Sequence, residues 1–415
     1  MGSTIVDSLS TLWIMDLKPE FEEAKNWVRD NLEFESSNTY TSHFEVSIRI
    51  LGGLLSAYEL SKDKIFLQKA ERLGQILVKN LNSEGFPYPF YNFQTQHGKP
   101  RKKLKYLTSY GPIYSKNFYL LSEIGTLSIE FSSLSHWTGN SSYSDVHESL
   151  LKKILSLLPR GLKPNRIFSD FTFTEVYSAA GEGDSYYEYL LKQFIHMPLR
   201  YSYLKDEAVE AIDCILENLV QQDVSGFYYI GMLKHGKLVP QMHHLACYFP
   251  GLLIKAIQKL DLKNPESYLV IAKELAYTCY NMYEQSASGL APEETYIEYG
   301  INFPWLSEYH YALRPETLES LYYLYTYTKD ETYREWALKI FKSIEKWAKN
   351  EIGFAEIKNV NKVPPVQTGC LPSYFFSETL KYLYLIFSEP SLIDPNTWVF
   401  NTEGHPFLIK HNSTL

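Results

Sequence analysis

Carboxylates at or near the start of helical segments are the side chains of this sequence best suited to chemistry. Glu45, Asp184 and Glu316 each stand close to a helix-start signal, while Glu123 and Glu378 interrupt otherwise apolar helical segments. An acid on an apolar face is costly unless it is paired or bound to a metal. Several such groups together could hold calcium, which takes about six to eight oxygen ligands, or divide the acid and base roles of glycoside hydrolysis. The pattern alone does not decide between these roles and ordinary ion pairing.

The first two acids each have a purely structural alternative. Ser42 and Glu45 have the spacing of a capping box, in which Glu45 only caps its helix, although Glu45 also shares a helix face with Arg49. Asp184 follows a glycine-containing turn and stands four residues before Glu188, so it fits an N-cap beside a solvated glutamate equally well. Both alternatives stay open on the sequence alone.

The third acid lies in the segment Leu313–Ser320. Pro315 suits the first position of a helix, and Glu316 then falls in the first turn, where the helix dipole favours the ionised carboxylate. Glu319 lies one turn further along the same face. This segment therefore fits a base or a metal-site acceptor, and plain ion pairing as well.

The elements that must position these acids are predicted to be almost all helices. Apolar residues recur at helical spacing in Phe44–Leu60, Ile65–Leu81, Glu123–Trp137, Ser185–Ile195, Glu207–Leu219, Pro265–Tyr283, Glu316–Thr328 and Thr332–Lys349. Buried and amphipathic helices alternate in pairs, which is typical of an α/α barrel of helical hairpins. In such a barrel the inner helices start at the same end, so their first residues can share one cavity. No linker divides the chain, and we predict one domain over residues 1–415.

Composition limits the classes of function. Of 415 residues, 45% are hydrophobic, which predicts a packed core, and the net charge of −8 argues against a nucleic-acid partner. The 34 tyrosines suit stacking on sugar rings, although they serve helix packing as well. The basic stretch Lys99–Lys105 is predicted to be a solvated loop.

Cysteines and targeting signals leave the compartment open. The four cysteines contain no Cys-x-x-Cys pair, which argues against zinc, and sequence alone cannot pair them. Asn140 and Asn412 begin glycosylation sequons. No apolar run approaches the ~20 residues of a membrane span, and no signal sequence precedes the first patterned segment. A secreted protein needs such a signal, so it is either missing from this chain or the protein stays in the cytosol.

Five motifs in order resemble those of glycoside hydrolase family 47, the class I α-1,2-mannosidases. They are FEVSIRILGGLLSAYEL (Phe44–Leu60), GDSYYEYLLKQF (Gly183–Phe194), LRPETLESLYYLY (Leu313–Tyr325), SETLKYLYLIFSE (Ser377–Glu389) and VFNTEGHP (Val399–Pro406). The resemblance runs almost end to end and implies one catalytic domain. Its fold would be an α/α barrel of about seven helical hairpins, the first incomplete, plugged by a C-terminal β-hairpin that carries Thr402.

The resemblance also assigns roles to the acids. Glu45 matches the general acid and Glu316 the general base, while Asp184 matches a third essential carboxylate that is the other candidate for the base. The reaction would invert configuration, which places acid and base about 6.5–9.5 Å apart to admit a water. The substrate would be terminal α-1,2-linked mannose of high-mannose N-glycans on glycoproteins.

A calcium ion is implied as well. The resemblance places it on the backbone carbonyl and hydroxyl of Thr402, with waters completing its shell. The carboxylates that would hold those waters are Asp184, Glu316, Glu319, Glu378 and Glu403. The other residues expected to line the substrate site are Arg49, Glu123, His244, Arg314 and Tyr374.

Cys247 and Cys279 match the disulfide of the family, which favours the lumen of the secretory pathway. The segment FEEAKNWVRDNLEFE leans toward the endoplasmic reticulum rather than the Golgi apparatus. We expect a monomer without nucleic-acid partners and without a membrane span in this chain, although members of the family usually carry a signal anchor before this domain.

Three features depart from the family pattern. The chain starts inside the motif STIVDSLSTLWIM, where relatives have an earlier helix, so the domain looks truncated. Pro372 replaces an acid, Tyr374 replaces the aromatic that stacks on the sugar, and His243 stands where an aspartate is usual. We therefore carry three hypotheses: a calcium-dependent mannosidase, an inactive or weakly active glycan-binding relative in glycoprotein quality control, and a cytosolic helical-barrel enzyme or scaffold.

Overall fold

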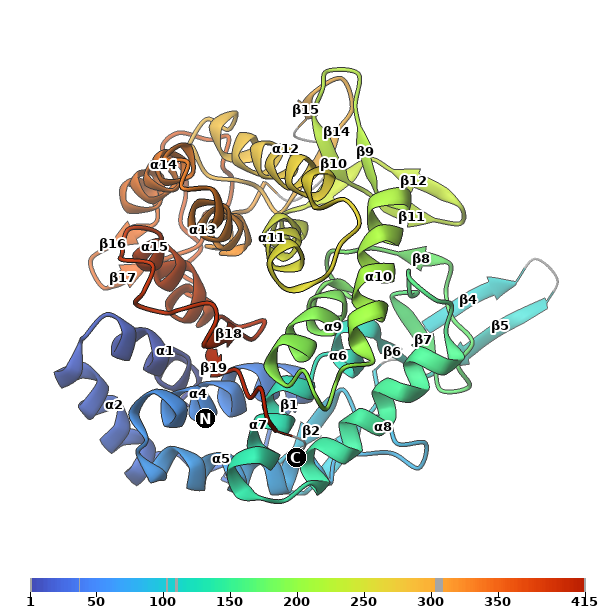
Figure 1. Cartoon of the computed structure of the whole chain (residues 1–415), viewed down its shortest axis with the longest axis vertical. Helices are drawn as coiled ribbons and strands as arrows, with labels where there is room; N and C mark the ends of the chain where they lie inside the picture. The colour runs from blue at the N-terminus through green and yellow to red at the C-terminus, as the bar shows by residue number, and fades with distance from the viewer. Residues whose placement is uncertain (1, 37, 102–103, 109–110, 303–308, 414–415) are drawn as a thin grey trace. The chain divides into compact units, whose positions relative to one another are not determined.

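The computed structural model describes residues 2–36, 38–101, 104–108, 111–302 and 309–413, and helices dominate it (Figure 1). The chain forms two compact units. Unit 1 comprises Met1–Tyr177, Ser185–Glu207 and Pro395–Leu415, and unit 2 comprises Ser178–Asp184 and Ala208–Asp394. Each unit is described by itself.

The helices follow the chain in the order of Figure 1. Those that begin before residue 200 are α1 (Ser3–Ile14), α2 (Lys18–Asn31), α3 (His43–Glu45), α4 (Gly52–Ser61), α5 (Lys64–Leu77), α6 (Leu121–Gly125), α7 (Ser128–Thr138), α8 (Ser142–Leu157) and α9 (Asp184–His196). Those that follow are α10 (Leu204–Asn218), α11 (Phe249–Lys259), α12 (Pro265–Glu284), α13 (Glu316–Thr328), α14 (Thr332–Trp347) and α15 (Leu380–Ile386). Shorter helical segments are the π-helical Val46–Leu51 and Phe375–Thr379 and the 3-10 segment His244–Tyr248.

The strands are short and mostly form antiparallel hairpins. In unit 1 they are β1 (Tyr40–Ser42), β2 (Phe90–Asn92), β3 (His97–Lys99), β4 (Leu104–Thr108), β5 (Gly111–Lys116), β6 (Phe118–Leu120), β7 (Arg166–Phe168), β8 (Val176–Tyr177), β18 (Trp398–Phe400) and β19 (Pro406–Leu408). In unit 2 they are β9 (Val220–Gln222), β10 (Tyr228–Ile230), β11 (Met232–Lys234), β12 (Lys237–Val239), β13 (Gln241–His243), β14 (Glu294–Ile297), β15 (Ile301–Asn302), β16 (Lys349–Asn350) and β17 (Gly353–Phe354).

Unit 1 is built from helical hairpins whose turns are explained locally. Helix α4 ends at Ser61, and the next residue, Lys62, takes a left-handed φ of 60°. Asp63 then caps α5 by accepting a hydrogen bond from the Ile65 amide at 3.1 Å. Helices α7 and α8 are likewise separated by Gly139 at φ 73°. Helix α1 packs against α2 and α4, so the first described residues already belong to the wall of this unit.

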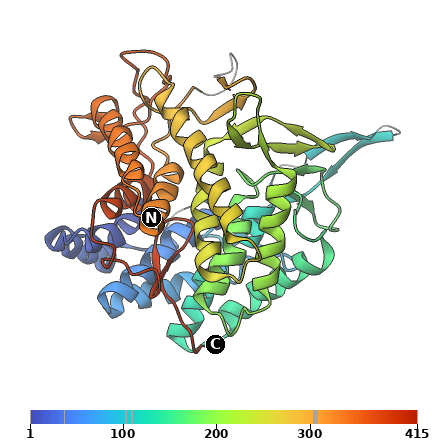
Figure 2. The ribbon, with the colours of Figure 1, turned by 45° about the horizontal axis from the view of Figure 1, so that its top comes forward.

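Unit 2 repeats the hairpin pattern, and its yellow and orange helices can be followed in Figure 2. Helix α13 ends at Thr328 and is followed by Lys329 with φ 60°, and the Thr332 amide donates to the Asp330 side chain at 3.0 Å as α14 starts. Helix α13 packs against α11, α12, α14 and α15. Its residues from Thr317 to Tyr325 are all buried, which makes it the central helix of this unit.

The structure corrects two details of the sequence prediction. The predicted helix Glu123–Trp137 is interrupted between α6 and α7, where Thr126 and Leu127 leave helical geometry. The predicted helix Phe44–Leu60 runs through a π-helical segment, Val46–Leu51. The other predicted helices lie within a few residues of α5, α9, α10, α12, α13 and α14.

The predicted C-terminal β-hairpin is confirmed. Strands β18 and β19 pair in antiparallel fashion, with Trp398 opposite Leu408 and Phe400 opposite Pro406. Thr402 lies in the turn between them. The hairpin packs on α4, where the Ser56 hydroxyl donates to the Pro406 carbonyl at 2.8 Å. Among the described residues, no helix is both long and apolar enough to cross a membrane.

Candidate active site

Glu45 and Arg49 form the first predicted site group, on the π-containing helix of unit 1. The Ser42 hydroxyl caps this helix by accepting from the Glu45 amide at 3.2 Å, as half of a capping box would. The Glu45 carboxylate, however, accepts from Arg49 Nε at 2.7 Å. Its side chain is 45% exposed, whereas that of Arg49 is 20% exposed. Glu45 is thus a reachable acid held by a neighbouring cation, and not only a helix cap.

Arg49 connects this acid to the C-terminal hairpin. Its terminal nitrogen Nη1 bonds to the buried carboxylate of Glu403 and lies 3.8 Å from Asp7 Oδ2 of helix α1. One guanidinium therefore faces three carboxylates. Asp7 also lies 3.2 Å from His405 Nε2, and Ser10 lies 3.1 Å from Nδ1 of the same ring. A π-helical turn often marks a functional position, and here it carries Arg49.

Thr402 offers two hard oxygens beside that network. Its amide donates to the Tyr189 hydroxyl at 3.4 Å. Within the described residues, no donor bonds to its carbonyl oxygen or its hydroxyl. The same residues contain no group of three His, Cys, Asp or Glu side chains arranged for a metal. The donor set at Thr402 thus fits a hard cation such as Ca²⁺ whose other ligands are water or substrate hydroxyls.

Glu123, a predicted substrate residue, lies on α6 in unit 1. It is 8% exposed and is bound by Arg101 through both Nε, at 3.2 Å from Oε2, and a terminal nitrogen. Burial raises the pKa of Glu123, and the nearby charge of Glu45 adds to that rise. The prediction that Lys99–Lys105 is a solvated loop is therefore wrong at Arg101, which pairs with this buried carboxylate. Residues 102–103 of that stretch lie outside the described residues.

Glu316 and His244 form the central pair of unit 2. Glu316 opens α13, and its Oε2 lies 2.9 Å from Nδ1 of the fully buried His244. On the other side of the ring, Nε2 lies 2.8 Å from the Tyr283 hydroxyl and 3.2 Å from the Thr317 hydroxyl. Burial raises the pKa of Tyr283 far above its usual value, so its hydroxyl keeps its proton. The Glu316 carboxylate can only accept, and in the neutral tautomer that donates to it the Nε2 atom accepts from the Tyr283 hydroxyl. The ring then donates from Nδ1 to the Glu316 carboxylate.

Arg314 is committed to a different acid. Its Nε and one terminal nitrogen bond to the Glu293 carboxylate at 3.1 and 2.7 Å. Burial opposes the charge of Glu293, but the hydrogen bonds and charge of Arg314 outweigh it and lower the pKa of Glu293. Tyr374 stacks beneath this guanidinium at 5.4 Å from its ring centre, and its hydroxyl donates to the Ala312 carbonyl at 2.6 Å. The hydroxyl that sets Tyr374 apart from the family pattern thus has a backbone partner, and the ring is retained.

The remaining predicted carboxylates of unit 2 are mostly buried. Glu319 and Glu378 are each 7% exposed, and Asp184 is partly exposed at the start of α9. The alternative of a solvated glutamate after Asp184 is wrong, because Glu188 is buried and bonds to Lys192. His243 caps the following turn by accepting from the Leu245 amide at 3.2 Å.

The disulfide between Cys247 and Cys279 is present. It joins the 3-10 segment His244–Tyr248 to α12, and Cys279 lies one turn before Tyr283. The bond therefore holds the segment that carries His244 against the helix that carries its hydroxyl partner. Neither Cys214 nor Cys370 takes part in a disulfide.

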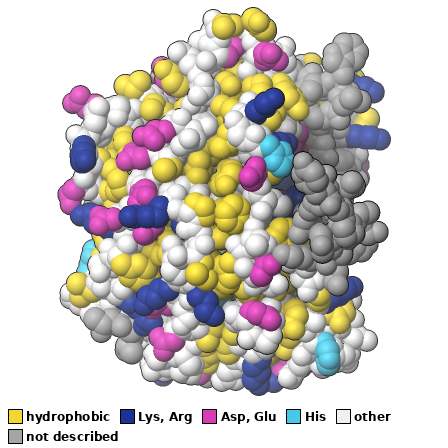
Figure 3. Space-filling model, turned by 90° about the vertical axis from the view of Figure 1, so that its right-hand side faces the viewer, with side chains coloured by type: hydrophobic (Ala, Val, Ile, Leu, Met, Phe, Trp, Pro, Cys, Tyr) yellow, Lys and Arg dark blue, Asp and Glu magenta, His cyan; other side chains and the backbone are white. Residues whose placement is uncertain are grey.

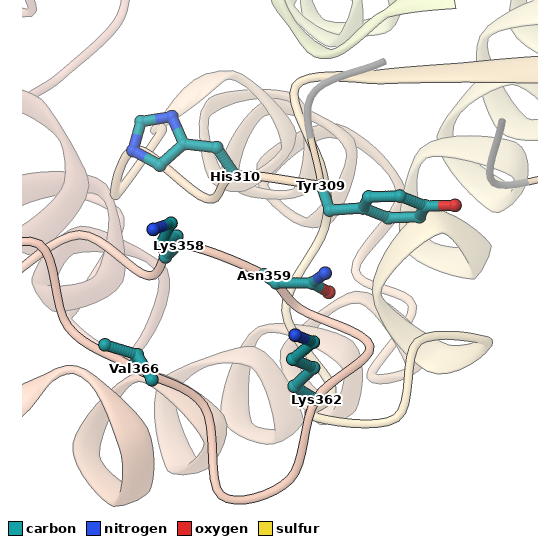
Figure 4. A pocket seen from close by; sticks show the side chains of 6 residues that line it. All are labelled: Tyr309, His310, Lys358, Asn359, Lys362 and Val366. Atoms are coloured by element: carbon teal, nitrogen blue, oxygen red, sulfur yellow. The ribbon is translucent and has the colours of Figure 1, made fainter. Parts of the chain in front are cut away.

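Figures 3 and 4 show two further features of the described surface. On the described part of the face in Figure 3, basic and acidic side chains are interspersed among apolar and polar ones. A hollow of about 550 Å³ in unit 2 is lined by Tyr309, His310, Lys358, Asn359, Lys362 and Val366 (Figure 4). None of these is a predicted site residue.

Several residues in these networks were not predicted. Asp7, Arg101, Tyr283 and Glu293 each contact a predicted site residue, yet they lie far from it in the chain. Glu293 follows a proline in a loop without helical periodicity, and only a structure brings it to Arg314. Asp7 alone had a usable signal, since it is an acid on the apolar helix Ser3–Ile14.

Comparison with known proteins identifies the class to which this fold and these networks belong. The chain belongs to glycosyl hydrolase family 47, whose model matches residues 1–409. It is 36% identical over 426 residues to mannosyl-oligosaccharide 1,2-alpha-mannosidase IB of Homo sapiens, covering 100% of this chain and 64% of that protein. It is also 36% identical over 428 residues to the endoplasmic reticulum mannosyl-oligosaccharide 1,2-alpha-mannosidase of Rattus norvegicus, covering 99% and 62%. The chain thus spans just under two thirds of the length of these relatives.

A solved structure agrees. The alpha-1,2-mannosidase from Trichoderma reesei superposes with a TM-score of 0.88 at 27% identity, covering 99% of this chain and 90% of that one. This likeness confirms the predicted all-α, α/α-barrel fold class.

Proposed function

We propose that this chain hydrolyses terminal α-1,2-linked mannose from high-mannose N-glycans, with inversion and with Ca²⁺ bound at Thr402. The observation that carries the proposal is the path from Glu45 through Arg49 to Glu403. One guanidinium joins the candidate acid to the residue that follows the candidate calcium ligand. The relatives named above are mannosyl-oligosaccharide 1,2-alpha-mannosidases, which supports the substrate class.

Two carboxylates divide the proton transfers. Glu45 is exposed enough to reach a glycosidic oxygen and would protonate the leaving group. Glu316 would accept the proton of the attacking water, with His244 fixing the orientation of its carboxylate by the 2.9 Å contact. Asp184 is the second candidate for that base. An inverting mechanism needs acid and base to be separate residues, which these assignments satisfy.

Thr402 would hold the metal through its carbonyl and hydroxyl, and a bound Ca²⁺ supplies a hard positive centre for sugar hydroxyls. The predicted acceptors for its waters are Asp184, Glu316, Glu319, Glu378 and Glu403. Arg49 keeps the Glu403 carboxylate in place beside the turn. Arg314, Glu123 and Tyr374 complete the proposed substrate contacts.

The proposed compartment is the lumen of the secretory pathway. The disulfide requires an oxidising environment, and Asn140 and Asn412 are exposed. Relatives of both kinds named above are equally similar, at 36% identity, so similarity does not separate the endoplasmic reticulum from other compartments. Detection of an intact Cys247–Cys279 bond and a glycan on Asn140 in native protein supports the lumen. Reduced thiols with an unmodified Asn140 would favour the cytosolic hypothesis.

The activity is tested with purified protein and a high-mannose oligosaccharide at saturating Ca²⁺. We expect release of free mannose, loss of release with a chelator, and recovery on adding Ca²⁺. Proton NMR at early times should show β-mannose first, because inversion of an α-linkage gives the β-anomer. An α-1,6-linked mannobiose serves as the control substrate and should stay intact.

Folded protein that binds the oligosaccharide without releasing mannose would replace the proposal by the glycan-binding alternative. Initial release of α-mannose would contradict inversion alone.

A further inference from the structure

Glu130 on α7 is a fully buried acid that the proposed chemistry does not use. Its Oε1 accepts hydrogen bonds from the Tyr189 hydroxyl at 2.6 Å and from Asn401 Nδ2 at 2.8 Å. Its Oε2 is buried and has no hydrogen-bond partner among the described residues. Burying a carboxyl with one unsatisfied oxygen costs free energy, which the hydrogen bonds to its other oxygen must offset.

Both donors that meet at Glu130 act on the turn that carries Thr402. Asn401 also donates to the Ile48 carbonyl at 3.1 Å, and its Oδ1 accepts from the amides of Glu403 and His405 at 3.0 and 2.8 Å. A single side chain thus holds the turn from inside.

Tyr189 reaches the turn directly. Its hydroxyl donates to Glu130 and accepts from the Thr402 amide. Burial raises the pKa of Tyr189 well above its usual value, so the hydroxyl keeps the proton that it donates. The Oε1 atom of Glu130 therefore orients both the Asn401 side chain and the Tyr189 hydroxyl that accepts from the Thr402 amide. Within the described residues, the Thr402 carbonyl and hydroxyl have no hydrogen-bond partner.

We propose that Glu130 is a positioning residue that locks the Asn401–His405 turn so that the Thr402 oxygens are preorganised for Ca²⁺. It acts as a hydrogen-bond acceptor through Asn401 and Tyr189, without touching the metal. The calcium part of this inference rests on the proposed function, whereas the locking of the turn is a property of the protein itself.

Two substitutions separate the acceptor from its charge. Glu130→Gln keeps an oxygen for both donors, while Glu130→Leu fills a similar volume without an acceptor. In calcium-free protein, we expect amide hydrogen exchange over residues 401–405 to be faster in Glu130→Leu and unchanged in Glu130→Gln. By calorimetric titration with Ca²⁺, Glu130→Leu should lose about 10- to 100-fold in affinity, as supporting residues of metal sites do, and Glu130→Gln should match the wild type.

Tyr189→Phe removes one donor only and gives the same test in a milder form, with faster exchange at the Thr402 amide. Ser56→Ala is the matched control, because it removes a buried 2.8 Å hydrogen bond to β19 of the same hairpin, outside the turn. It should lower the melting temperature and leave the 401–405 exchange and the calcium affinity unchanged.

Wild-type exchange and affinity in both Glu130→Leu and Tyr189→Phe would overturn the inference. It would also be overturned if Glu130→Gln lost as much as Glu130→Leu, which assigns the effect to charge, or if Ser56→Ala reproduced the loss. If the wild-type protein bound no Ca²⁺, the proposed function would be contradicted. The comparison of amide hydrogen exchange over residues 401–405 would still decide whether Glu130 locks the turn.

Discussion

The acid groups of the two units use arginine in opposite ways. In unit 1, Arg49 is shared among Glu45, Glu403 and Asp7, so no carboxylate has the cation to itself. In unit 2, the hydrogen bonds of Arg314 go to Glu293, and Glu316 is hydrogen-bonded to an imidazole. The Glu45 side chain is 45% exposed and that of Glu316 only 13%.

This difference agrees with the proposed roles of Glu45 as general acid and Glu316 as general base in glycoside hydrolysis. A general acid must reach a leaving group that enters from solvent, which the exposure of the Glu45 side chain allows. A general base must be held in one orientation toward a water, which a buried ring with fixed hydrogen-bond partners provides. The partners, more than the acids themselves, distinguish the two roles.

The sharpest way to break the comparison is to remove each carboxylate in turn. Glu45→Gln and Glu316→Gln should each lower kcat on the oligosaccharide by about 10²- to 10⁴-fold, the usual worth of a general acid or base. With α-mannosyl fluoride, whose leaving group needs no proton, only Glu316→Gln should remain slow. Initial rates on both substrates measure this. Equal rescue of both variants by the fluoride would contradict the assignment of acid and base.

The second prediction compares Arg49, which several carboxylates share, with Arg314, whose hydrogen bonds go to one carboxylate. Arg49→Lys should lower calcium affinity by about tenfold, because a single ammonium cannot bridge Glu45 and Glu403 as a guanidinium fork does. Arg314→Lys breaks an equally buried fork in the other unit and should leave calcium affinity unchanged while weakening substrate binding. Calorimetry and KM report the two effects. Equal calcium affinities for the two variants would contradict a role for the Arg49 bridge between Glu45 and Glu403 in calcium binding.

The imidazole arrangement makes a smaller prediction. Tyr283→Phe removes the hydroxyl that donates to His244 Nε2 and should lower kcat about fivefold, the worth of roughly one hydrogen bond. The pH dependence of kcat should also shift, because the tautomer of His244 is no longer fixed. Tyr186→Phe is the matched control, a fully buried tyrosine whose hydroxyl has no partner among the described residues. A loss as large in Tyr186→Phe would mean that only packing was tested.

Much of this architecture could be predicted from the sequence, because helix periodicity and capping are local. The bounds of α13 agree with the prediction, and the motif order placed Thr402 in a hairpin turn. The predicted capping box of Ser42 and Glu45 is confirmed for one of its two hydrogen bonds, since the Ser42 hydroxyl accepts from the Glu45 amide. It could not say that the Glu45 carboxylate would turn to Arg49 instead.

The rest depended on contacts between distant segments. Asp7 meets Arg49, and Glu130 meets Asn401, across separations of 42 and 271 residues. No period or spacing in one sequence encodes such pairs. The break between α6 and α7 was missed for a related reason, since apolar periodicity continues through Thr126 and Leu127 while the backbone does not.

The last comparison concerns the pH dependence of stability, which should differ between a buried carboxyl of unit 1 and one of unit 2. Burial raises the pKa of Glu130 from 4.5 to about 7, so the folded state keeps a proton that the unfolded chain releases. Its contribution to the free energy of unfolding therefore falls as pH rises from about 4.5 to 7. Glu293 behaves oppositely: its lowered pKa gives stability that is present above the unfolded value and lost as pH falls through the folded one.

Thermal unfolding from about pH 2 to about pH 7.5 measures both slopes. Glu130→Gln should gain stability relative to wild type as pH rises from about 5 to 7, by about 1.4 kcal/mol for each unit of pKa difference. Glu293→Gln should lose stability at pH 7, and that loss should shrink only below about pH 4.5, as pH falls through the lowered pKa of Glu293. Parallel curves for the two variants would mean that these carboxyls titrate alike in both units. The contrast between a hydrogen-bonded acid behind Thr402 and an ion-paired acid beside Arg314 would then not hold.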